Sequence, residues 1–402
     1  MEGPLAGIRV LEVANFLAVP SAAALMADMG ADVIKVEPPE GDTYRLHRGD
    51  ADFNFDFPTS YGFELDNRGK RSIVLNLRRT EAVEVVWKLA ERADVFMTNL
   101  LPRRKERYRL RYQDLSRRNP RLVYLVFSGY GPEGPDKDRP AFDYTAFWAR
   151  SGVMSLYSDP NLPPLQLRPG MGDHAASPLL LAGVLAALLV RERSGKGQEI
   201  TASLLNMGFW VVAADVQRTL VAGQEPRYYR RATEINPLRN TYRTSDGRWI
   251  NLVMFDREAN WTSLCEALGS EGLVADPRYK TPDDRKARCE ELVKDLDKIF
   301  ASMTMDELAS RFDAHGVIWA PKQSLLEAID DPQVKANDFF KTLQHPTHGP
   351  YRTLNTPIHF SDSEVGAKAP APELGQHTKE VLQELGYTWQ EIEDLRSCGA
   401  IS

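Results

Sequence analysis

One aspartate, Asp173, lies in a glycine-flanked turn just before the most apolar stretch of the chain, residues 179–190. An aspartate side chain ordinarily has a pKa of about 3.9, so this carboxylate would be ionised at neutral pH. It could act as a nucleophile without a general base. An aspartate ahead of a helix is also a common N-cap, which accepts hydrogen bonds from free backbone N–H groups.

Ser177 and Pro178 favour a role for Asp173 as a nucleophile over a role as the helix N-cap. Serine is a good N-cap and proline suits the first helical position. We therefore predict an apolar helix that begins at this pair, with Asp173 in the loop before it. His174 is a rival base, but a lone histidine beside an aspartate is more often structural or solvated.

Two basic clusters could bind phosphate groups. Residues 68–71 precede a predicted strand, and residues 103–107 follow another. Arginine and lysine bind phosphate oxygens through charge-assisted hydrogen bonds. From these clusters we select Lys70 and Arg107 as phosphate contacts; the alternative is a solvated basic face.

Composition excludes several classes of protein. The chain has 402 residues, of which 43% are hydrophobic and 26% charged, with a net charge of −6. This acidity argues against a nucleic-acid partner. The N-terminus lacks a signal-peptide pattern, and the apolar run 178–190 is shorter than the ~20 residues of a membrane span, so no membrane is expected. Three separated cysteines fit a reduced, cytoplasmic protein, and neither they nor the scattered histidines suggest a metal site.

Strands and helices alternate along the first part of the chain. We predict strands at 8–13, 33–36, 72–77, 94–98 and 122–128, with helices at 20–29, 80–92 and 114–118, and an extended segment at 199–205. This order predicts an α/β fold with a Rossmann-like, doubly wound parallel sheet. Ligands of such sheets lie beyond the carboxyl ends of the strands. Asn15, Asn99 and residues 128–131 follow strands, so we expect the site at that edge.

A second, smaller α+β domain is predicted at 225–320, where a hairpin around residues 245–247 is followed by charged amphipathic helices. The large domain then comprises residues 1–224, and residues 321–402 return to it. No GxGxxG, GxxxxGK[ST] or GxSxG motif occurs where it would need to be. These absences favour an enzyme with a carboxylate nucleophile.

An ordered set of motifs resembles the family III CoA-transferases, or CaiB/BaiF family. This family includes formyl-CoA transferase, carnitine CoA-transferases and α-methylacyl-CoA racemase. The motifs are Gly7–Glu12, Gly30–Pro38, Asn67–Ser72, Gly172-Asp173, Arg193–Gln198 and Leu374–Thr378. The resemblance runs from about residue 5 to the C-terminus.

The resemblance implies an interlocked homodimer whose large domain is made from both termini of the chain. It implies acyl-CoA and a carboxylic acid as substrates, with no cofactor beyond coenzyme A itself. Asp173 would be the catalytic carboxylate, passing through a mixed anhydride and an aspartyl-CoA thioester. Backbone N–H groups around Gly172 would stabilise the oxyanions. Lys70, Asn99 and Arg107 match CoA-contact positions of the family.

Some positions depart from relatives within the family. Formyl-CoA transferase has glutamine where this chain has Leu17, arginine where it has Pro38, and a glycine-rich lid where it has residues 255–258. A formyl or oxalyl substrate is therefore not expected. The alternatives are an acyl-CoA racemase on the same fold, which Phe142 disfavours because it replaces the proton-transferring histidine, and a catalytically silent CoA-binding protein.

Aromatic residues crowd the segment before Asp173. They are Phe142, Tyr144, Phe147, Trp148 and Tyr157. Core packing is their expected role. If some line the pocket, a bulky or aromatic acid suits it better than an acid of one or two carbons.

Overall fold

The computed structural model describes residues 2–47, 60–165, 167–233 and 236–402. These residues form two compact units. The large unit comprises residues 1–226 and 337–402, and the small unit comprises residues 227–336.

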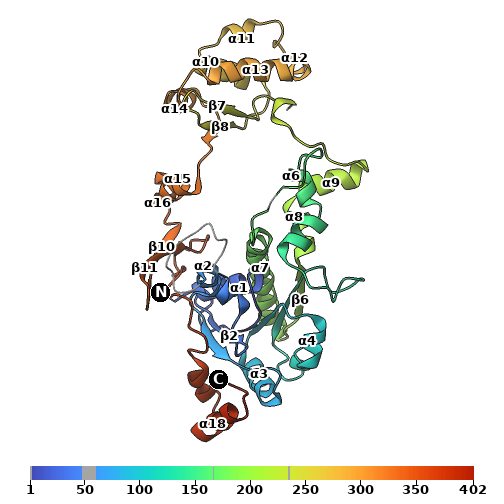
Figure 1. The fold of residues 1–402 in the computed structure, drawn as a ribbon, viewed down its shortest axis with the longest axis vertical. Helices are drawn as coiled ribbons and strands as arrows, with labels where there is room; N and C mark the ends of the chain where they lie inside the picture. The colour runs from blue at the N-terminus through green and yellow to red at the C-terminus, as the bar shows by residue number, and fades with distance from the viewer. Residues whose placement is uncertain (1, 48–59, 166, 234–235) are drawn as a thin grey trace. The chain divides into compact units, whose positions relative to one another are not determined.

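The elements of the large unit come from both ends of the chain (Figure 1). In chain order they are β1 (Arg9–Val13), α1 (Ala18–Asp28), β2 (Asp32–Glu37), η1 (Thr43–Leu46), α2 (Tyr61–Asn67), β3 (Arg71–Val74), α3 (Thr80–Arg92), β4 (Val95–Thr98), α4 (Pro102–Arg107), α5 (Tyr112–Leu115), β5 (Val123–Ser128), η2 (Tyr144–Arg150), α6 (Val153–Tyr157), α7 (Met171–Ser194), β6 (Glu199–Ser203), α8 (Leu204–Val211), α9 (Ala213–Ala222), β10 (Phe340–His345), β11 (Gly349–Leu354), α17 (Thr378–Glu384) and α18 (Trp389–Ser397).

The predicted doubly wound sheet is confirmed. Among the described residues, six parallel strands pair in the order β3-β2-β1-β4-β5-β6. In this order β1 and β4 are the two neighbours from which the chain winds in opposite directions. The crevice beyond their carboxyl ends is where ligands of this architecture bind.

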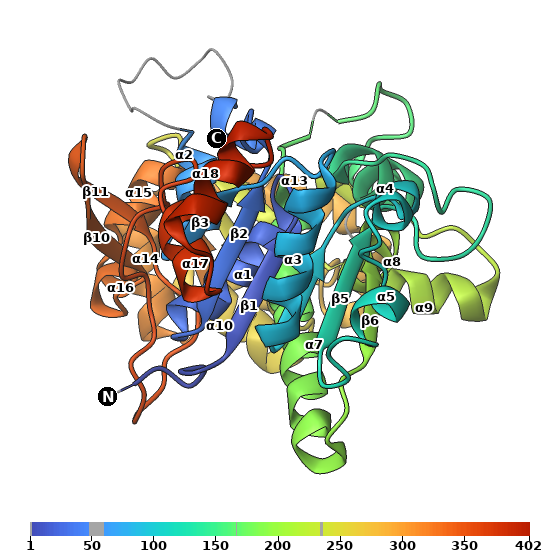
Figure 2. The same cartoon turned by 90° about the horizontal axis from the view of Figure 1, so that it is seen from below.

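Both faces of the sheet are covered, so its strands read as nearly continuous apolar runs. Successive side chains of a strand point to opposite faces. Accordingly, Val10 of β1 belongs to a core that includes residues of α1 and α7, whereas Leu11 belongs to a core with α3, α17 and α18. Figure 2 shows α3 and α17 on the face of the sheet turned toward the viewer. The C-terminal helices therefore complete the large unit.

Helix α7 differs from the prediction in its start. It begins at Met171 rather than after Ser177, so Asp173 lies in its first turn and Pro178 lies inside the helix. Ser177 does not cap it: the hydroxyl lies 3.1 Å from the carbonyl oxygen of Ala18 at the start of α1 and 3.0 Å from that of Asp173. Packing against α1 thus outweighs the hydrogen bond that Pro178 cannot donate.

By length and composition α7 could cross a membrane. Leu180, Leu181, Val184 and Leu188 of this helix are nevertheless buried in the core of the large unit. That packing accounts for part of its apolar character, whereas Leu179, Leu189 and Val190 are exposed.

The small unit has its own sheet and core. Its elements are η3 (Arg231–Thr233), β7 (Thr241–Arg243), β8 (Trp249–Leu252), α10 (Glu258–Ala267), α11 (Gly272–Ala275), α12 (Pro282–Ala287), α13 (Cys289–Phe300), α14 (Met305–Ala314), β9 (Trp319–Pro321), α15 (Leu325–Asp330) and α16 (Pro332–Ala336). The boundary expected at residue 320 differs from the structure. β9 pairs antiparallel with β8, so the strand stays in the small unit, which continues to Ala336.

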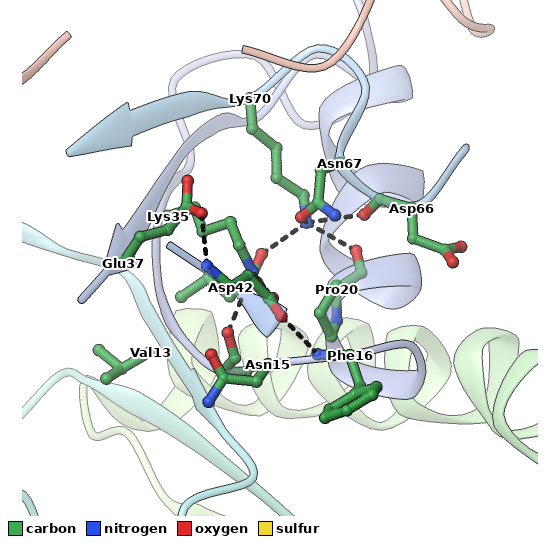
Figure 3. Close-up of polar contacts among 12 residues, drawn as sticks. Val13, Asn15, Phe16, Pro20, Lys35, Glu37, Asp42, Asp66, Asn67 and Lys70 are labelled. Atoms are coloured by element: carbon green, nitrogen blue, oxygen red, sulfur yellow. Dashed lines mark hydrogen bonds and ion pairs between the residues drawn. The ribbon is translucent and has the colours of Figure 1, made fainter. Parts of the chain in front are cut away.

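A buried charge network joins the ends of β1 and β2 to the segment before β3 (Figure 3). Both carboxylate oxygens of Glu12 are used: Oε1 lies 2.8 Å from Lys35 Nζ, and Oε2 lies 2.6 Å from Lys70 Nζ. The three side chains are fully buried. Lys35 Nζ also lies 3.0 Å from a carboxylate oxygen of Asp42.

The pKa values of the two lysines in this network are shifted in opposite directions. Burial opposes the charge of Glu12, but Lys35 and Lys70 outweigh it and lower the pKa of this carboxyl. Burial lowers the pKa of Lys70 to about 8, although Glu12 opposes that shift. Burial alone would lower the pKa of Lys35, but the carboxylates of Glu12 and Asp42 outweigh burial and raise it.

We predict that Glu12→Gln destabilises the protein by about 3–5 kcal/mol, because it leaves two buried ammonium groups without their shared anion. The matched control, Glu91→Gln, removes one half of an exposed ion pair with Arg118 and should cost about 0–1 kcal/mol. Urea unfolding of both variants measures the difference. A loss below 1 kcal/mol in Glu12→Gln would contradict this account of the network.

Candidate functional site

A reciprocal pair of hydrogen bonds marks the crevice between β1 and β4. The side-chain oxygen of Asn99, just after β4, accepts from the backbone N–H of Asn15, just after β1, at 3.1 Å. The Asn99 amide donates back to the Asn15 carbonyl at 2.7 Å. The two strand ends that the sequence places at one edge of the sheet are thus joined there.

A cavity of about 860 Å³ opens at this edge of the large unit. Its lining includes Phe16, Leu17, Tyr44, Asn99, Lys105, Arg111, Ser128, Gly129, Gly131, Lys137, Arg139, Phe142, Asp143, Tyr144, Gly170, Asp173 and His174. Asn99, Ser128, Gly129 and Gly131 are strand-end residues that were expected at the site, whereas Asn15 and Tyr130, also expected there, do not line the cavity. The volume is in the usual range for a small-molecule site.

Phe16 lines this cavity in a left-handed backbone conformation, with φ of 63°. A non-glycine residue seldom adopts such a conformation, and its cost must be offset by the surroundings. Two members of the buried network hold the loop: the Ala14 carbonyl accepts from Lys35 at 3.0 Å, and Asp42 accepts from the Phe16 N–H at 3.3 Å. The network therefore shapes one wall of the cavity.

Two glycines allow Asp173 to enter the cavity from the first turn of α7. Gly170 precedes the helix with φ of 78°, a conformation that favours glycine. A Cβ on Gly172 would lie 2.4 Å from the Phe147 ring, so the close approach of α7 to η2 requires glycine there. The glycine-flanked turn seen in the sequence is thus explained by backbone conformation and by packing.

The environment of Asp173 disfavours its charge. Burial is the largest cause, and the nearby carboxylates of Asp143 and Asp66 add to it, while His174 opposes them; together they raise the pKa of Asp173 to about 7. From the ordinary pKa of an aspartate, we expected Asp173 to be ionised at neutral pH. With a pKa of about 7, it is instead only partly ionised there. A carboxylate with a raised pKa is also a more basic nucleophile once it ionises.

Asp143 is the second carboxyl group of the pocket. It is buried, and its Oδ2 has no hydrogen-bond partner among the described residues. Burial raises its pKa, opposed by the backbone N–H groups of Tyr144, Gly172 and Gly170. The glycine N–H groups expected to stabilise an oxyanion thus face Asp143 instead.

Lys70 does not line the cavity. Its ammonium is fully buried and lies within 2.9 Å of four acceptors: Glu12, the carbonyls of Pro20 and Asp66, and the Asn67 side chain. Figure 3 labels Pro20, Asp66 and Asn67 around Lys70. An ammonium group has only three protons to donate. No donor remains for a phosphate, so the predicted phosphate contact is replaced by a structural role.

Arg107 does not line the cavity either, although its helix does contribute to the wall. Lys105 of the same helix is a lining residue, and burial lowers its pKa. Helical residues two positions apart differ by about 200° in direction, so Lys105 and Arg107 point to different sides. Of the basic cluster that follows β4, Lys105 therefore lines the cavity and Arg107 does not.

Three further basic residues line the cavity and were not among the selected phosphate contacts. Arg111 precedes α5, and Lys137 and Arg139 lie in the segment between β5 and η2. Charge alone does not separate them from a solvated face. Only the path of the chain around the cavity brings them to it.

The aromatic residues before Asp173 divide between core and cavity. Phe147 and Trp148 are buried in the core. Phe142 and Tyr144 line the cavity and are 55% and 40% exposed, while Tyr157 is exposed elsewhere. Phe142 packs edge-on against Phe16 with ring centroids 5.2 Å apart. The cavity therefore has an aromatic wall beside its carboxyl groups.

Comparisons with known proteins agree along nearly the whole chain. Residues 5–378 match the family model of CoA-transferase family III. The chain is 33% identical to an (R)-2-hydroxy-4-methylpentanoate CoA-transferase of Clostridioides difficile, over 98% of each sequence. It is 32% identical to a cinnamoyl-CoA:phenyllactate CoA-transferase of Clostridium sporogenes, over 97% of this chain and 95% of that one.

A solved structure has the same fold. It is a CaiB/BaiF family protein from Brucella suis, which is 30% identical and superposes with a TM-score of 0.84 over 96% of this chain and all of that one. The relatives named here are CoA-transferases, which does not favour the racemase alternative.

We predict that Asp173 titrates with a midpoint near pH 7, and that Asp143→Asn lowers this midpoint by removing a like charge. Carbon-13 NMR of aspartate carboxyl groups measures both values, with the Asp173 signal assigned by its loss in Asp173→Asn. Asp215→Asn, on α9, serves as a control that should leave the midpoint in place. A wild-type midpoint near 4 would contradict the effect of burial.

Proposed function

The chain belongs to CoA-transferase family III, and from this premise we propose that it moves CoA from an acyl-CoA to a carboxylic acid through covalent intermediates on Asp173. The observation that carries the proposal is the position of this carboxyl. Asp173 lies in the first turn of α7, lines the 860 Å³ cavity and has a pKa raised to about 7. Such a group can attack a thioester as its carboxylate.

In the first half-reaction, Asp173 attacks the carbonyl carbon of the donor thioester. The carbon–sulfur bond breaks, CoA leaves as its thiolate, and a mixed anhydride joins Asp173 to the acyl group. The thiolate then attacks the Asp173 carbonyl of the anhydride. This step releases the donor acid and leaves an aspartyl-CoA thioester.

The second half-reaction reverses these steps with another acid. The acceptor carboxylate attacks the aspartyl thioester and expels the CoA thiolate, which gives a new mixed anhydride. The thiolate attacks the acceptor carbonyl, and the product acyl-CoA leaves with Asp173 restored. Atoms and charge balance without a redox or metal step, so we expect no cofactor beyond CoA as substrate.

The basic lining residues suit the phosphate groups of CoA. Lys105, Arg111, Lys137 and Arg139 line the same cavity as Asp173. They replace Lys70 and Arg107 as the phosphate contacts that we propose. Asn99 remains at the crevice, where its amide holds the Asn15 loop.

The aromatic wall suits a bulky or aromatic acid. Phe16, Phe142 and Tyr144 border the cavity that holds Asp173. The two relatives whose names include phenyllactate and 2-hydroxy-4-methylpentanoate agree with this size class. An acid of one or two carbons would leave the apolar surface in contact with water.

We propose that the enzyme works as a cytoplasmic homodimer. Exposed apolar residues on α8 and α9, including Trp210, Leu220 and Val221, offer surface for a second copy. Three free cysteines suit a reducing compartment. Sedimentation should give twice the chain mass of 45.3 kDa, and a monomer would exclude the dimer.

We predict that incubation with an acyl-CoA donor and hydroxylamine places a hydroxamate on Asp173. Phenylpropanoyl-CoA, 4-methylpentanoyl-CoA and succinyl-CoA are suitable donors, and peptide mass mapping locates the modification. Asp173→Ala should abolish it and reduce CoA transfer by at least 10³-fold, as expected when a covalent nucleophile is removed.

The matched control is Asp306→Ala, in the first turn of α14 of the small unit. This variant should keep both the modification and the activity. Full CoA transfer in Asp173→Ala would contradict the proposal.

We predict that Phe142→Ala lowers kcat/KM about tenfold for phenyllactate and much less for acetate. Loss of part of an aromatic contact costs about 1–2 kcal/mol, and 1.4 kcal/mol corresponds to a factor of ten. Steady-state kinetics with both acids measures the change. Equal turnover of formate, acetate and phenyllactate by the wild type would contradict the proposed acid class.

A further inference from the structure

A histidine beside Asp173 is held by a buried carboxylate. His174 Nε2 lies 3.0 Å from Oδ1 of Asp66 on α2. The Asp66 side chain is fully buried, whereas the His174 side chain is 42% exposed and lines the cavity. One ring nitrogen is thus fixed by the protein, and the ring still reaches the cavity.

Asp66 needs a cation. Its second oxygen, Oδ2, has no hydrogen-bond partner among the described residues, although the residue is buried. A buried charge without a partner is costly, and pairing it with an imidazolium reduces that cost. The backbone of Asp66 is itself fixed, because its carbonyl accepts from Lys70 at 2.9 Å.

The charges around His174 favour its protonated form. Burial alone would lower its pKa, but the hydrogen bond and charge of Asp66, together with the charge of Asp173, outweigh burial and raise it. The charge of Arg68 opposes them. Arg68 is itself paired with Asp28 at 2.6 Å.

Next to the nucleophile, negative groups outnumber positive ones. Two carboxyl groups, Asp143 and Asp66, act on Asp173 there and raise its pKa. Among the described groups that most affect Asp173, His174 is the sole cation. The proposed reaction brings a further carboxylate, the acid substrate, to the same place, and this anion needs a positive partner.

We propose that His174, held as an imidazolium by Asp66, binds the carboxylate of the acid substrate beside Asp173. This inference rests on the proposed CoA transfer and adds a residue that binds the acid. Because Asp66 engages Nε2, Nδ1–H is the donor that remains for the acid. The Nδ1 atom lies on the side of Gly170, 3.6 Å from where a Cβ of that residue would be.

The geometry gives the acid carboxylate a defined role. One of its oxygens accepts from Nδ1–H, and the other attacks the carbonyl carbon of the aspartyl-CoA thioester. The carbon–sulfur bond breaks and CoA leaves as the thiolate. His174 keeps its proton throughout, so it binds and orients the acid without acting as a general acid.

The test is the pH dependence of KM for the acid. We use phenyllactate or 4-methylpentanoate, whichever is the better acceptor for the wild type. An imidazolium loses its charge as pH rises through its pKa, so the wild-type KM should rise at alkaline pH. Below the pH at which the wild-type KM rises, His174→Gln should raise KM about tenfold. This effect should exceed any loss in kcat. The variant should also lack the rise in KM at alkaline pH.

Asp66→Asn separates binding from a structural role. It keeps the size of the side chain but removes the charge that favours the imidazolium, so the rise in KM should move to lower pH. His315→Gln, in the small unit at the end of α14, is the control and should keep the wild-type profile.

Two outcomes would overturn the inference. One is an unaltered KM in His174→Gln, and the other is an alkaline rise in KM that stays in place in Asp66→Asn. Failure of the proposed function is distinguishable, because the wild type would then form no trapped adduct at Asp173 with any donor.

Discussion

The site depends on the pair of ion pairs that the Glu12 carboxylate makes with Lys35 and Lys70. The two oxygens of this carboxylate bind Lys35 and Lys70 in a fully buried environment at the carboxyl ends of the strands. From Lys35 the network extends to Ala14 and fixes the loop that follows β1. From Lys70 it extends to the carbonyl of Asp66 and fixes the end of α2. Both elements line the cavity, so the buried charge network fixes the position of two of its walls.

The acidic pocket is held by several separate sets of contacts, one of which is the cluster. Asp66, Asp143 and Asp173 come from three different parts of the chain, and the charges of Asp66 and Asp143 both disfavour a charge on Asp173. Each is held by its own contacts: the Asp66 carbonyl accepts from Lys70, the Asp143 carboxyl accepts from backbone N–H groups of Tyr144, Gly172 and Gly170, and Asp173 follows the left-handed Gly170 at the start of α7. Such preorganisation lets a carboxyl group retain a raised pKa, which is common at catalytic sites.

The sequence predicted the fold more completely than the site. Strand and helix periodicity located the parallel sheet, and the strand ends located Asn99 and the crevice. It could not show that α7 starts at Met171, because Ser177-Pro178 is a stronger local signal than the packing of α7 against α1. Lys70 was misread for a similar reason. A lysine beside other basic residues resembles a phosphate contact until its four buried acceptors are known.

The central claim is that Asp173 is covalently linked to the acyl group and to CoA in turn. A single turnover with an acceptor acid labelled with oxygen-18 in its carboxylate tests it most directly. When the thiolate attacks the acceptor carbonyl of the mixed anhydride, the bridging oxygen stays with the aspartate. Mass mapping should therefore find one oxygen-18 atom in the side chain of Asp173. Direct attack of the acid on the donor thioester would leave Asp173 unlabelled, and that result, alongside full transfer, would contradict the account.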